Sequence, residues 1–503
     1  MSRYVVIGGG VSGLAAARLL AGAPGVSDPL EDGASNGGTG AETETGTAGT
    51  EVIILEASER LGGKVLTADA AGALVELGPD QFLRRDPSAE RLCRLLGLGD
   101  DLVAPGAGTA AVVAYGLPRQ LPAGLVLGIP TDLDALAGSG IVSDAAVGYA
   151  RGDAERPGVV IEAADVGLDR SASRHTERSA GAVLRPRLGD EIVDRLVDPL
   201  IGGINAGSID NLSLGIVAPQ IARALVGHHD VIAPLAALAP APESPLGPRP
   251  SPFLGLAGGL GRLVRAVEEE LDGLGCERRL GCAVLGIRRA PGGGFVVESS
   301  DGELTADGIV LAIPAGPAAN LLAEVAPAAA DLLGAVTYGS VAVVTLAYDE
   351  PAPAAFGGWT GVLVPRVEGT VMTALTLLSQ KWPWMAGASP AGMLLRVSAG
   401  RHLDDRIDEL DDAELTRTVE AELAKVTGIS ARATDHHVQR WRGALPQYVP
   451  GYAADMASVS SSLAQAGGVG LAGAVLGGIG LPACITSGER AAATVKALVA
   501  ASR

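Results

Sequence analysis

The sequence predicts an α/β protein in which a Rossmann-type, dinucleotide-binding domain is combined with a second, discontinuous α+β domain. Three observations predict this. The apolar run at residues 4–7 is followed at once by a G-x-G-x-x-G pattern and a Leu- and Ala-rich stretch, which is the order strand, tight turn, helix. A second apolar run at residues 53–55 ends in an acidic residue, as the second strand of such a domain does. Beyond it, helical and alternating strand patterns follow one another along 503 residues, enough for two domains.

The glycine pattern predicts a phosphate-binding turn. Gly8 permits the turn, Gly10 lets the backbone approach a pyrophosphate, and Gly13 lets the helix pack closely on the strand. The N-terminus of that helix favours the phosphate charge. An ordinary glycine turn is the alternative, but the order of strand, glycines, helix, strand and acidic residue argues against it. We therefore expect a dinucleotide on Gly8, Gly9, Gly10, Val11, Ser12 and Gly13.

Glu56 ends the second strand and is placed to accept a hydrogen bond from a ribose hydroxyl. A carboxylate there disfavours a 2′-phosphate, which argues against NADP. Glu56 follows Gly13 by 43 residues, whereas about 20 is usual. Residues 23–50 are rich in Gly, Thr, Ala and Glu, and this composition predicts a flexible surface insertion.

Composition excludes several classes of function. The net charge of −19 argues against nucleic acid or an anionic membrane face as the main partner. The four cysteines and six histidines show no metal-ligand or disulfide spacing, so we expect no metal and reduced thiols in a cytoplasmic protein. The N-terminus starts directly with the first strand, which argues against a cleaved signal sequence.

The uncharged segment 456–488 is long enough to cross a bilayer. It is crowded with Gly and contains Pro482, a composition that suits close approach of backbone to a ligand rather than a membrane span. We expect a strand, a loop and a helix beginning near Ile485, whose N-terminal N–H groups point at a polar group.

The residues after Glu56 read ASERLGGKVLT. This stretch resembles the arginine and double-glycine motif of FAD proteins of the amine-oxidase and protoporphyrinogen-oxidase superfamily. The resemblance implies that Ala57, Arg60 and Gly63 contact the cofactor and that Lys64 lies near the flavin. A Gly-Gly hairpin turn with a solvated lysine is the alternative.

Further along, the order of motifs resembles the oxygen-dependent coproporphyrinogen III oxidase and protoporphyrinogen oxidase family. Its carriers are LVELGPDQ at residues 74–81 and the segments 121–143 and 194–214. The resemblance implies that a backbone contact at the adenine side falls on Val284 and that Trp441 stacks near the flavin, with a buried structural tryptophan as the alternative. It also places two further groups at the flavin: Gly78, Pro79, Asp80 and Gln81; and Gly473, Ile479, Gly480 and Leu481.

The same resemblance implies a division of the chain between two domains. We expect the FAD-binding domain to comprise residues 1–100, 255–315 and 435–503. The substrate-binding domain would comprise residues 101–254 and 316–434.

The family's activity implies oxidation of a porphyrinogen to a porphyrin in haem biosynthesis. A hydride leaves a bridging carbon for the flavin, ring N–H protons are lost, and dioxygen reoxidises the flavin to give hydrogen peroxide, in three cycles per macrocycle. The sequence shows no nucleophile and base pair, so we expect no catalytic side chain; the cofactor carries the redox chemistry. Coproporphyrinogen III is the preferred substrate and protoporphyrinogen IX the close alternative. A flavin oxidase acting on amines or polyenes, and a flavin-carrying partner protein without turnover, stay open.

Substrate carboxylates need cations. Arg84 and Arg85 follow the expected flavin contact by a few residues, and we predict that one of them binds a propionate. The alternative is that both are solvated charges or partners of Asp86. A transient contact with the next enzyme of the haem pathway is a further expectation.

Overall fold

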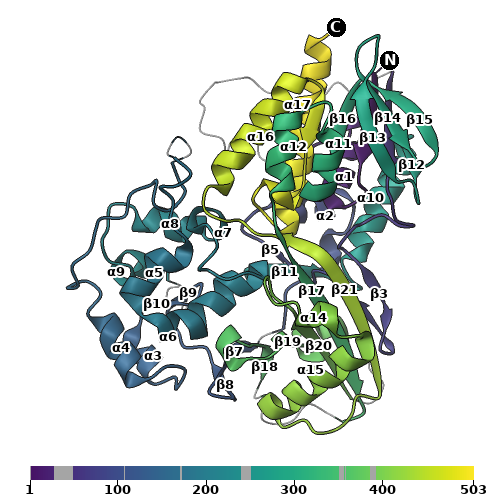
Figure 1. Cartoon of the computed structure of the whole chain (residues 1–503). Helices are drawn as coiled ribbons and strands as arrows, with labels where there is room; N and C mark the ends of the chain where they lie inside the picture. Colours follow the sequence, from purple (N-terminus) through teal and green to yellow (C-terminus); the bar gives the residue numbers. More distant parts are fainter. Residues whose placement is uncertain are drawn as a thin grey trace.

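The computed structural model describes residues 2–27, 49–106, 108–169, 171, 173–239, 251–350, 356, 358–385 and 392–503. The described chain forms a body around a parallel sheet, a second body around a seven-stranded sheet, and a helical lobe (Figure 1). The predicted α/β class with a Rossmann-type domain is confirmed.

The parallel sheet is the frame of the nucleotide-binding body. All four of its strand pairings are parallel. In spatial order its strands are β12 (Glu277–Arg279), β2 (Thr50–Leu55), β1 (Ser2–Ile7), β16 (Gly308–Leu311) and β22 (Val469–Leu471). Its strands β1, β2, β16 and β22 are largely buried on both faces, which explains why they read as continuous apolar runs, whereas the edge strand β12 is charged and partly exposed.

Alternate residues of β1 face opposite layers. Tyr4 and Val6 pack with α1 (Val11–Leu20), α10 (Gly261–Gly273) and α17 (Leu481–Ala501). Val5 and Ile7 pack with the opposite layer. That layer comprises an antiparallel meander and three helices: β13 (Val284–Arg289), β14 (Phe295–Ser299), β15 (Gly302–Ala306), α11 (Ala315–Leu322), α12 (Pro327–Gly334) and α16 (Tyr452–Ala466).

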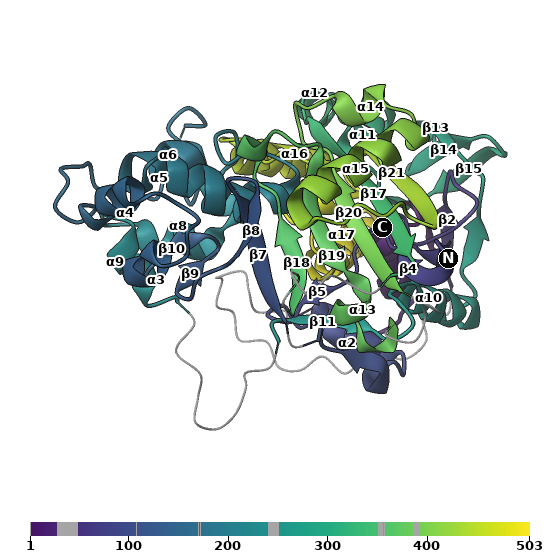
Figure 2. The same cartoon turned by 90° about the horizontal axis from the view of Figure 1, so that it is seen from below.

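The seven-stranded sheet is antiparallel except where β18 pairs with β7. Helix α15 (Asp412–Thr427) packs on one of its faces. In Figure 2, β7 and β8 lie between the helical lobe and the other strands. The spatial order is β21 (Asp435–Pro446), β17 (Tyr338–Tyr348), β20 (Met393–Ala399), β19 (Met372–Leu377), β18 (Trp359–Leu363), β7 (Thr109–Ala114) and β8 (Leu117–Gln120).

The helical lobe has its own apolar core. It consists of α3 (Leu133–Ala137), α4 (Asp144–Arg151), α5 (Ala180–Leu188), α6 (Asp190–Ile192), the π-helix at Val193–Gly202, the 3-10 turn at Gly203–Asn205, α7 (Leu214–Val217), α8 (Pro219–Leu225) and α9 (Ile232–Ala236).

Short elements join these three parts. The hairpin of β3 (Thr67–Ala70) and β4 (Ala73–Glu76) packs with Leu394 of the seven-stranded sheet. A small sheet pairs β5 (Phe82–Leu83) and β6 (Leu102–Val103) with β11 (Phe253–Leu256), and β9 (Leu125–Val126) pairs with β10 (Ile129–Pro130). The remaining helices are α2 (Ser88–Leu95), α13 (Leu378–Lys381) and α14 (Arg406–Glu409), with short 3-10 turns at Gly99–Asp101, Arg366–Glu368, Pro383–Met385 and Ala474–Leu476.

Three expected boundaries fall differently in the structure. Helices α11 and α12 pack on the parallel sheet, so the chain leaves the nucleotide-binding body after α12 and not at residue 316. Residues 435–446 form β21 of the seven-stranded sheet, so the last return to the nucleotide-binding body comes after this strand and not at residue 435. The insertion expected at 23–50 is also shorter, because Thr50 already belongs to β2 and Val26 is buried. The buried Glu489 of α17 accepts hydrogen bonds from the Val26 and Ser27 backbone N–H groups, both at 2.9 Å. The rest of the predicted loop, 28–48, lies outside the described residues.

The segment 456–488 divides between α16, β22 and the start of α17. Within the described residues, no helix is both long and apolar enough to cross a membrane. The same part of the chain holds no cluster of three or more His, Cys, Asp or Glu side chains arranged for a metal ion.

Candidate functional site

At two positions of the turn between β1 and α1, a side chain would clash with the protein's own backbone, so only glycine fits. Gly8 has φ +103°, and a Cβ there would lie 2.5 Å from the Ala312 carbonyl oxygen. A Cβ on Gly13 would lie 1.9 Å from the Gly8 carbonyl oxygen. These positions let α1 pack directly on the strand end, as the sequence pattern predicts.

Gly10 is different, because nothing in the protein forbids a side chain there. It is the N-cap of α1 with φ −71° and ψ 175°. An added Cβ would meet only the Gly63 Cα, at 3.9 Å. The absent side chain therefore leaves open space in front of the first turn of α1, where the N–H groups have no partner within the helix. This is a cradle of the kind that a pyrophosphate fits.

Glu56 stands at the edge of this cradle. Its Oε2 accepts the Gly9 N–H at 2.6 Å, and its Oε1 accepts the Ser58 N–H at 2.9 Å and the Ser58 hydroxyl at 2.7 Å. The carboxylate is thus fixed beside the glycine turn and keeps lone pairs for a further donor. Ala57, the next residue, is exposed.

Arg60 holds the double-glycine loop against the glycine turn. Its guanidinium donates to the Gly63 carbonyl at 2.6 Å and to the Leu61 carbonyl at 3.1 Å. The loop in turn donates from the Gly62 N–H to the Gly9 carbonyl at 2.8 Å. Arg60 therefore acts within the protein by shaping the loop.

Lys64 directly follows the double glycine of this loop. Its side chain is exposed, yet the surrounding protein desolvates the amine enough to lower the pKa of Lys64, against an opposing effect of Cys484. Burial raises the pKa of the Cys484 thiol, which lies in the first turn of α17 beside Ser12 of α1. The N-terminal turns of α1 and α17 thus meet at Lys64.

The segment at Leu77 and Gly78 lies directly on this loop. A Cβ on Gly78 would lie 1.8 Å from the Lys64 carbonyl oxygen, so only glycine fits. Trp441 of β21 donates from its indole Nε1 to the Leu77 carbonyl at 2.7 Å, and Arg396 of β20 donates to the Gly78 carbonyl. The seven-stranded sheet therefore holds Leu77 and Gly78 in place, and Gly78 packs against the double-glycine loop at Lys64.

Asp80 faces protein partners. Its Oδ2 accepts from Lys381 Nζ at 2.7 Å and from Trp382 Nε1 at 3.2 Å, and its Oδ1 lies 3.6 Å from Arg396 Nη1. Burial alone would raise the pKa of Asp80, but the two cations and these hydrogen bonds outweigh it and lower the pKa. The next residue, Gln81, has a buried Oε1 without a partner in the described chain.

The C-terminal loop completes the arrangement. Gly473 donates from its N–H to Ser487 Oγ at 2.9 Å, and its missing Cβ would lie 3.9 Å from Ser12 Oγ. Tyr448 holds the following turn by donating to the Ala474 carbonyl at 2.6 Å. Gly480 is the N-cap of α17, which begins at Leu481 and not near Ile485, because Pro at the second position suits a helix start. Residues Ile479, Gly480 and Leu481 therefore lead into a helix N-terminus.

Val284 is the first residue of β13, the strand that follows β12 in the sequence; β12 pairs with β2. The Cys282 N–H donates to the Glu56 carbonyl at 2.9 Å, so Val284 follows a backbone contact with the Glu56 loop by two residues. A predicted cofactor contact at Val284 is compatible with this position.

The two arginines predicted to meet substrate have exposed side chains. Arg84 is 43% exposed and pairs with Glu90 of α2 at 3.2 Å. Arg85 is exposed. The sequence did not single out Lys381 and Arg396, although a charged residue in the apolar strand MLLRVSA signals a buried partner.

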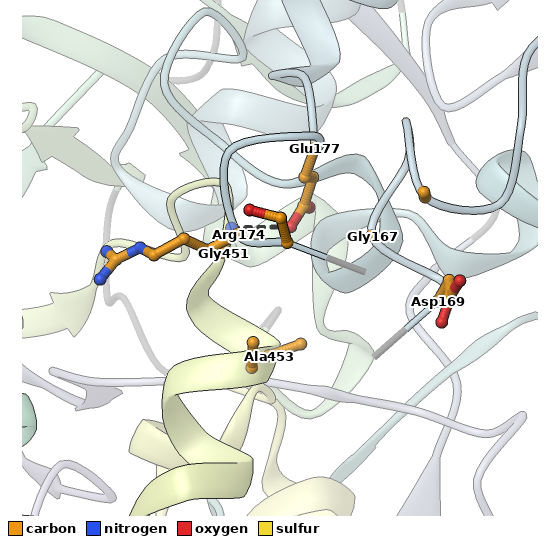
Figure 3. Close-up of a pocket in the computed structure, with 9 residues that line it drawn as sticks. Gly167, Asp169, Arg174, Glu177, Gly451 and Ala453 are labelled. Carbon is orange, nitrogen blue, oxygen red and sulfur yellow. Dashed lines mark hydrogen bonds between the residues drawn. The ribbon is translucent and has the colours of Figure 1, made fainter. Parts of the chain in front are cut away.

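A small surface pocket lies elsewhere, between the loop at residues 164–177 and the start of α16 (Figure 3). Glu177 fills it, since its carboxylate accepts the Gly451 N–H at 2.7 Å and bonds Ser213 Oγ. An added Cβ at Gly167 would lie 2.2 Å from the Glu177 Oε1. None of the predicted site residues lines this pocket.

The residues present fit a dinucleotide whose two halves lie at opposite ends of one continuous region. The open cradle at Gly10, the anchored carboxylate of Glu56 and the N-terminal turns of α1 and α17 supply donors and an acceptor in one continuous region. Glycines at positions 63 and 78 bring its walls together without side chains.

Comparison with known proteins agrees with this arrangement. A family model described as "Flavin containing amine oxidoreductase" matches residues 11–496. The coproporphyrinogen III oxidase of Bacillus subtilis is 31% identical over 97% of this chain and 96% of its own. That of Mycobacterium leprae is 31% identical over 99% of both chains. A solved structure from Exiguobacterium sp. 255-15, named for protoporphyrinogen oxidase, has a TM-score of 0.80 and 29% identity over 99% of both chains.

The family model spans most of the chain, from the first residue of α1 into α17, and the two oxidases align over 97% and 99% of it. The chain belongs to the flavin-containing amine oxidoreductase family and, within it, to the coproporphyrinogen III oxidase and protoporphyrinogen oxidase family.

Proposed function

We propose that this protein is an FAD-dependent oxidase that converts coproporphyrinogen III to coproporphyrin III in haem biosynthesis, with dioxygen as acceptor and hydrogen peroxide as product. The observation that carries the proposal is the similarity to two coproporphyrinogen III oxidases, at 31% identity along almost the whole of both chains. The open backbone at Gly10 and the carboxylate of Glu56 support the dinucleotide part of the proposal.

FAD is the form of flavin that the cradle favours. A flavin mononucleotide has one phosphate and no adenosine, whereas the Gly10 cradle and Glu56 together form the half-site for an adenosine ribose and a pyrophosphate. On this proposal the phosphates lie at Gly10, Val11 and Ser12, and the adenine lies toward Val284. The flavin ring lies among Lys64, Gly78, Trp441 and the turn at Ile479, Gly480 and Leu481.

Bound FAD would supply the hydride acceptor and the later reaction with dioxygen. The protein's contribution is to bind, orient and exclude water. Lys64 would place a positive charge at the ring, and partial desolvation by the surrounding protein lowers its pKa. Gly78 would present backbone alone to the ring, since the Leu77–Gly78 carbonyls are held from behind by Trp441 and Arg396.

Asp80 does not serve as a general base in this proposal. It is paired with two cations, which lower its pKa, so it is a poor proton acceptor at neutral pH. Ring N–H protons therefore leave to solvent or to the substrate's own carboxylates. The expectation that no side chain acts as a catalytic base remains a prediction.

Protoporphyrinogen IX is the second candidate substrate. The similarity to the Exiguobacterium protein, named for protoporphyrinogen oxidase, supports it. Protoporphyrinogen carries two propionates where coproporphyrinogen carries four. The number of cations at the substrate site therefore distinguishes the two candidate substrates. Arg84 or Arg85 as propionate partner, a transient contact with the next pathway enzyme and a cytoplasmic location stay predictions.

The test is a parallel aerobic assay of the purified yellow protein with coproporphyrinogen III, protoporphyrinogen IX and a panel of amines. Porphyrin fluorescence and peroxide are measured together. We expect fastest turnover of coproporphyrinogen with three peroxide molecules per porphyrin. Faster turnover of protoporphyrinogen would make it the substrate, and oxidation of amines alone would refute a porphyrinogen oxidase. A yellow protein with no turnover of any of them would indicate a flavin-carrying partner.

A further inference from the structure

Three largely buried, charged side chains form a cluster at Asp80. Its members come from three parts of the chain: Asp80 from the loop after β4, Lys381 from the end of α13, and Arg396 from β20. Lys381 Nζ lies 2.7 Å from Asp80 Oδ2, and Arg396 Nη1 lies 3.6 Å from Asp80 Oδ1. The three side chains are only 11–13% exposed, so their charges act on one another with little screening.

The cluster carries more positive than negative charge. Two cations share one carboxylate, and no other described carboxylate forms an ion pair with either cation. A further acid, Glu76, interacts electrostatically with Arg396. Burial raises the pKa of Glu76 to about 7, so near neutral pH this side chain is only partly ionised. A buried excess charge is costly unless an anion compensates it.

The two cations also have unused hydrogen-bond donors. Lysine offers three N–H groups and arginine five. The described partners are the Asp80 carboxylate and the Gly78 carbonyl. Arg396 Nε is buried without any partner in the described chain. Both the charge and the donors are therefore those of a site that accepts an anion.

The cluster lies on the sheet face that looks toward the cofactor site. Thr345 of β17 pairs with Arg396, and Val341 pairs with Trp441. Residues 341 and 345 of one strand point to the same side, so Arg396 and Trp441 share a face. They also hold successive carbonyls of Leu77 and Gly78. Asp80, at which the two cations meet, thus follows Gly78 by two residues.

We propose that Lys381 and Arg396 form a subsite that binds a carboxylate of the substrate, with Asp80 as the fixed counter-ion that orients them. The inference rests on the proposed function, because it assigns the carboxylate to a porphyrinogen. Charged hydrogen bonds to a carboxylate are strongest where water is excluded, as at this junction. Arg84 is less suited, since it is largely exposed and already paired with Glu90.

The test measures equilibrium binding of coproporphyrin III and of its tetramethyl ester to the FAD-loaded protein, by porphyrin fluorescence in one buffer. The ester keeps the ring and removes every carboxylate charge. We expect Lys381→Met to weaken binding of the free acid about tenfold or more and to leave binding of the ester unchanged. Lys381→Arg keeps the charge and should retain most of the preference for the acid. Lys425→Met is the matched control, because Lys425 is an exposed lysine in the last turn of α15, and it should change neither. Arg84→Ala is measured beside them as the alternative carboxylate partner.

A second variant guards against misfolding of Lys381→Met. Asp80→Asn removes the counter-ion and raises the excess charge, so it should strengthen binding of the acid relative to the ester. Flavin content and melting temperature are measured for each variant. An unchanged ratio of acid to ester affinity in Lys381→Met and Asp80→Asn would overturn the subsite, and a loss confined to Arg84→Ala would move it to that residue. If the wild-type protein bound neither porphyrin and oxidised no porphyrinogen, the proposed function itself would fail.

Discussion

Gly10→Val separates cofactor binding from folding. The φ of −71° is accessible to valine, and an added Cβ meets only the Gly63 Cα at 3.9 Å. The remaining cost to the protein is the replacement of glycine by valine at a helix N-cap, about 1 kcal/mol. A pyrophosphate on this backbone would instead collide with the valine methyl groups. We therefore expect a folded protein that has lost at least about 100-fold in flavin affinity, or about 3 kcal/mol.

The assay compares visible flavin absorbance per protein after purification, followed by titration of the apoprotein with FAD. Gly148→Val in α4 is the matched control, because an added Cβ there meets nothing within 4 Å and the helical lobe holds no predicted cofactor contact. Gly13→Val should fail to fold, since its Cβ would lie 1.9 Å from a carbonyl oxygen. Full flavin content in Gly10→Val, with unchanged affinity on titration, would refute the placement of the pyrophosphate.

Three further predictions use other parts of the chain. Shortening residues 28–48 to a short linker should change the free energy of unfolding by only about 1 kcal/mol, because closure entropy varies with the logarithm of length; a large loss of turnover would contradict this. Glu76 has a pKa raised by burial from 4.5 to about 7. Since the folded-state pKa is the higher one, its contribution to stability should fall as pH rises from about 4.5 to about 7, by up to roughly 3 kcal/mol. Glu76→Gln should remove this slope in denaturant titrations, and an identical slope in both proteins would exclude Glu76 as its cause. The double variant of Arg84 and Arg85 to Ala tests the sequence-based substrate contact: if either binds a propionate, the Michaelis constant for a porphyrinogen rises, equivalent to roughly 1–3 kcal/mol, at unchanged flavin content.

The nucleotide-binding body could be predicted from the sequence because its constraints are local. The glycine turn, Glu56 and the double glycine each depend on backbone within a few residues, and close packing at Gly8 and Gly13 leaves no other residue type possible. The order of motifs then identified the family. The start of α17 was misplaced because an uncharged Gly-rich stretch gives no period by which to locate its first turn.

The charge cluster could not be predicted because its members are distant in sequence. Asp80 precedes Lys381 by 301 residues, and only the pairing of β20 with β17 brings Arg396 to the same place. The structure pairs the Asp80 carboxylate with protein cations, and the contact of Asp80 with the flavin stays a prediction. Strand β21 was assigned to the wrong body for the same reason, since its partner β17 lies about a hundred residues earlier.

Anaerobic mixing with coproporphyrinogen III tests the central claim most directly. In the absence of dioxygen, the yellow absorbance of the wild-type protein should bleach on adding one equivalent of coproporphyrinogen, and it should return on admitting air, with peroxide released and porphyrin fluorescence appearing over repeated turnover. Gly10→Val, lacking flavin, should show none of these changes. A protein that binds flavin fully but keeps its yellow absorbance under anaerobic coproporphyrinogen and protoporphyrinogen would contradict the assignment as a porphyrinogen oxidase.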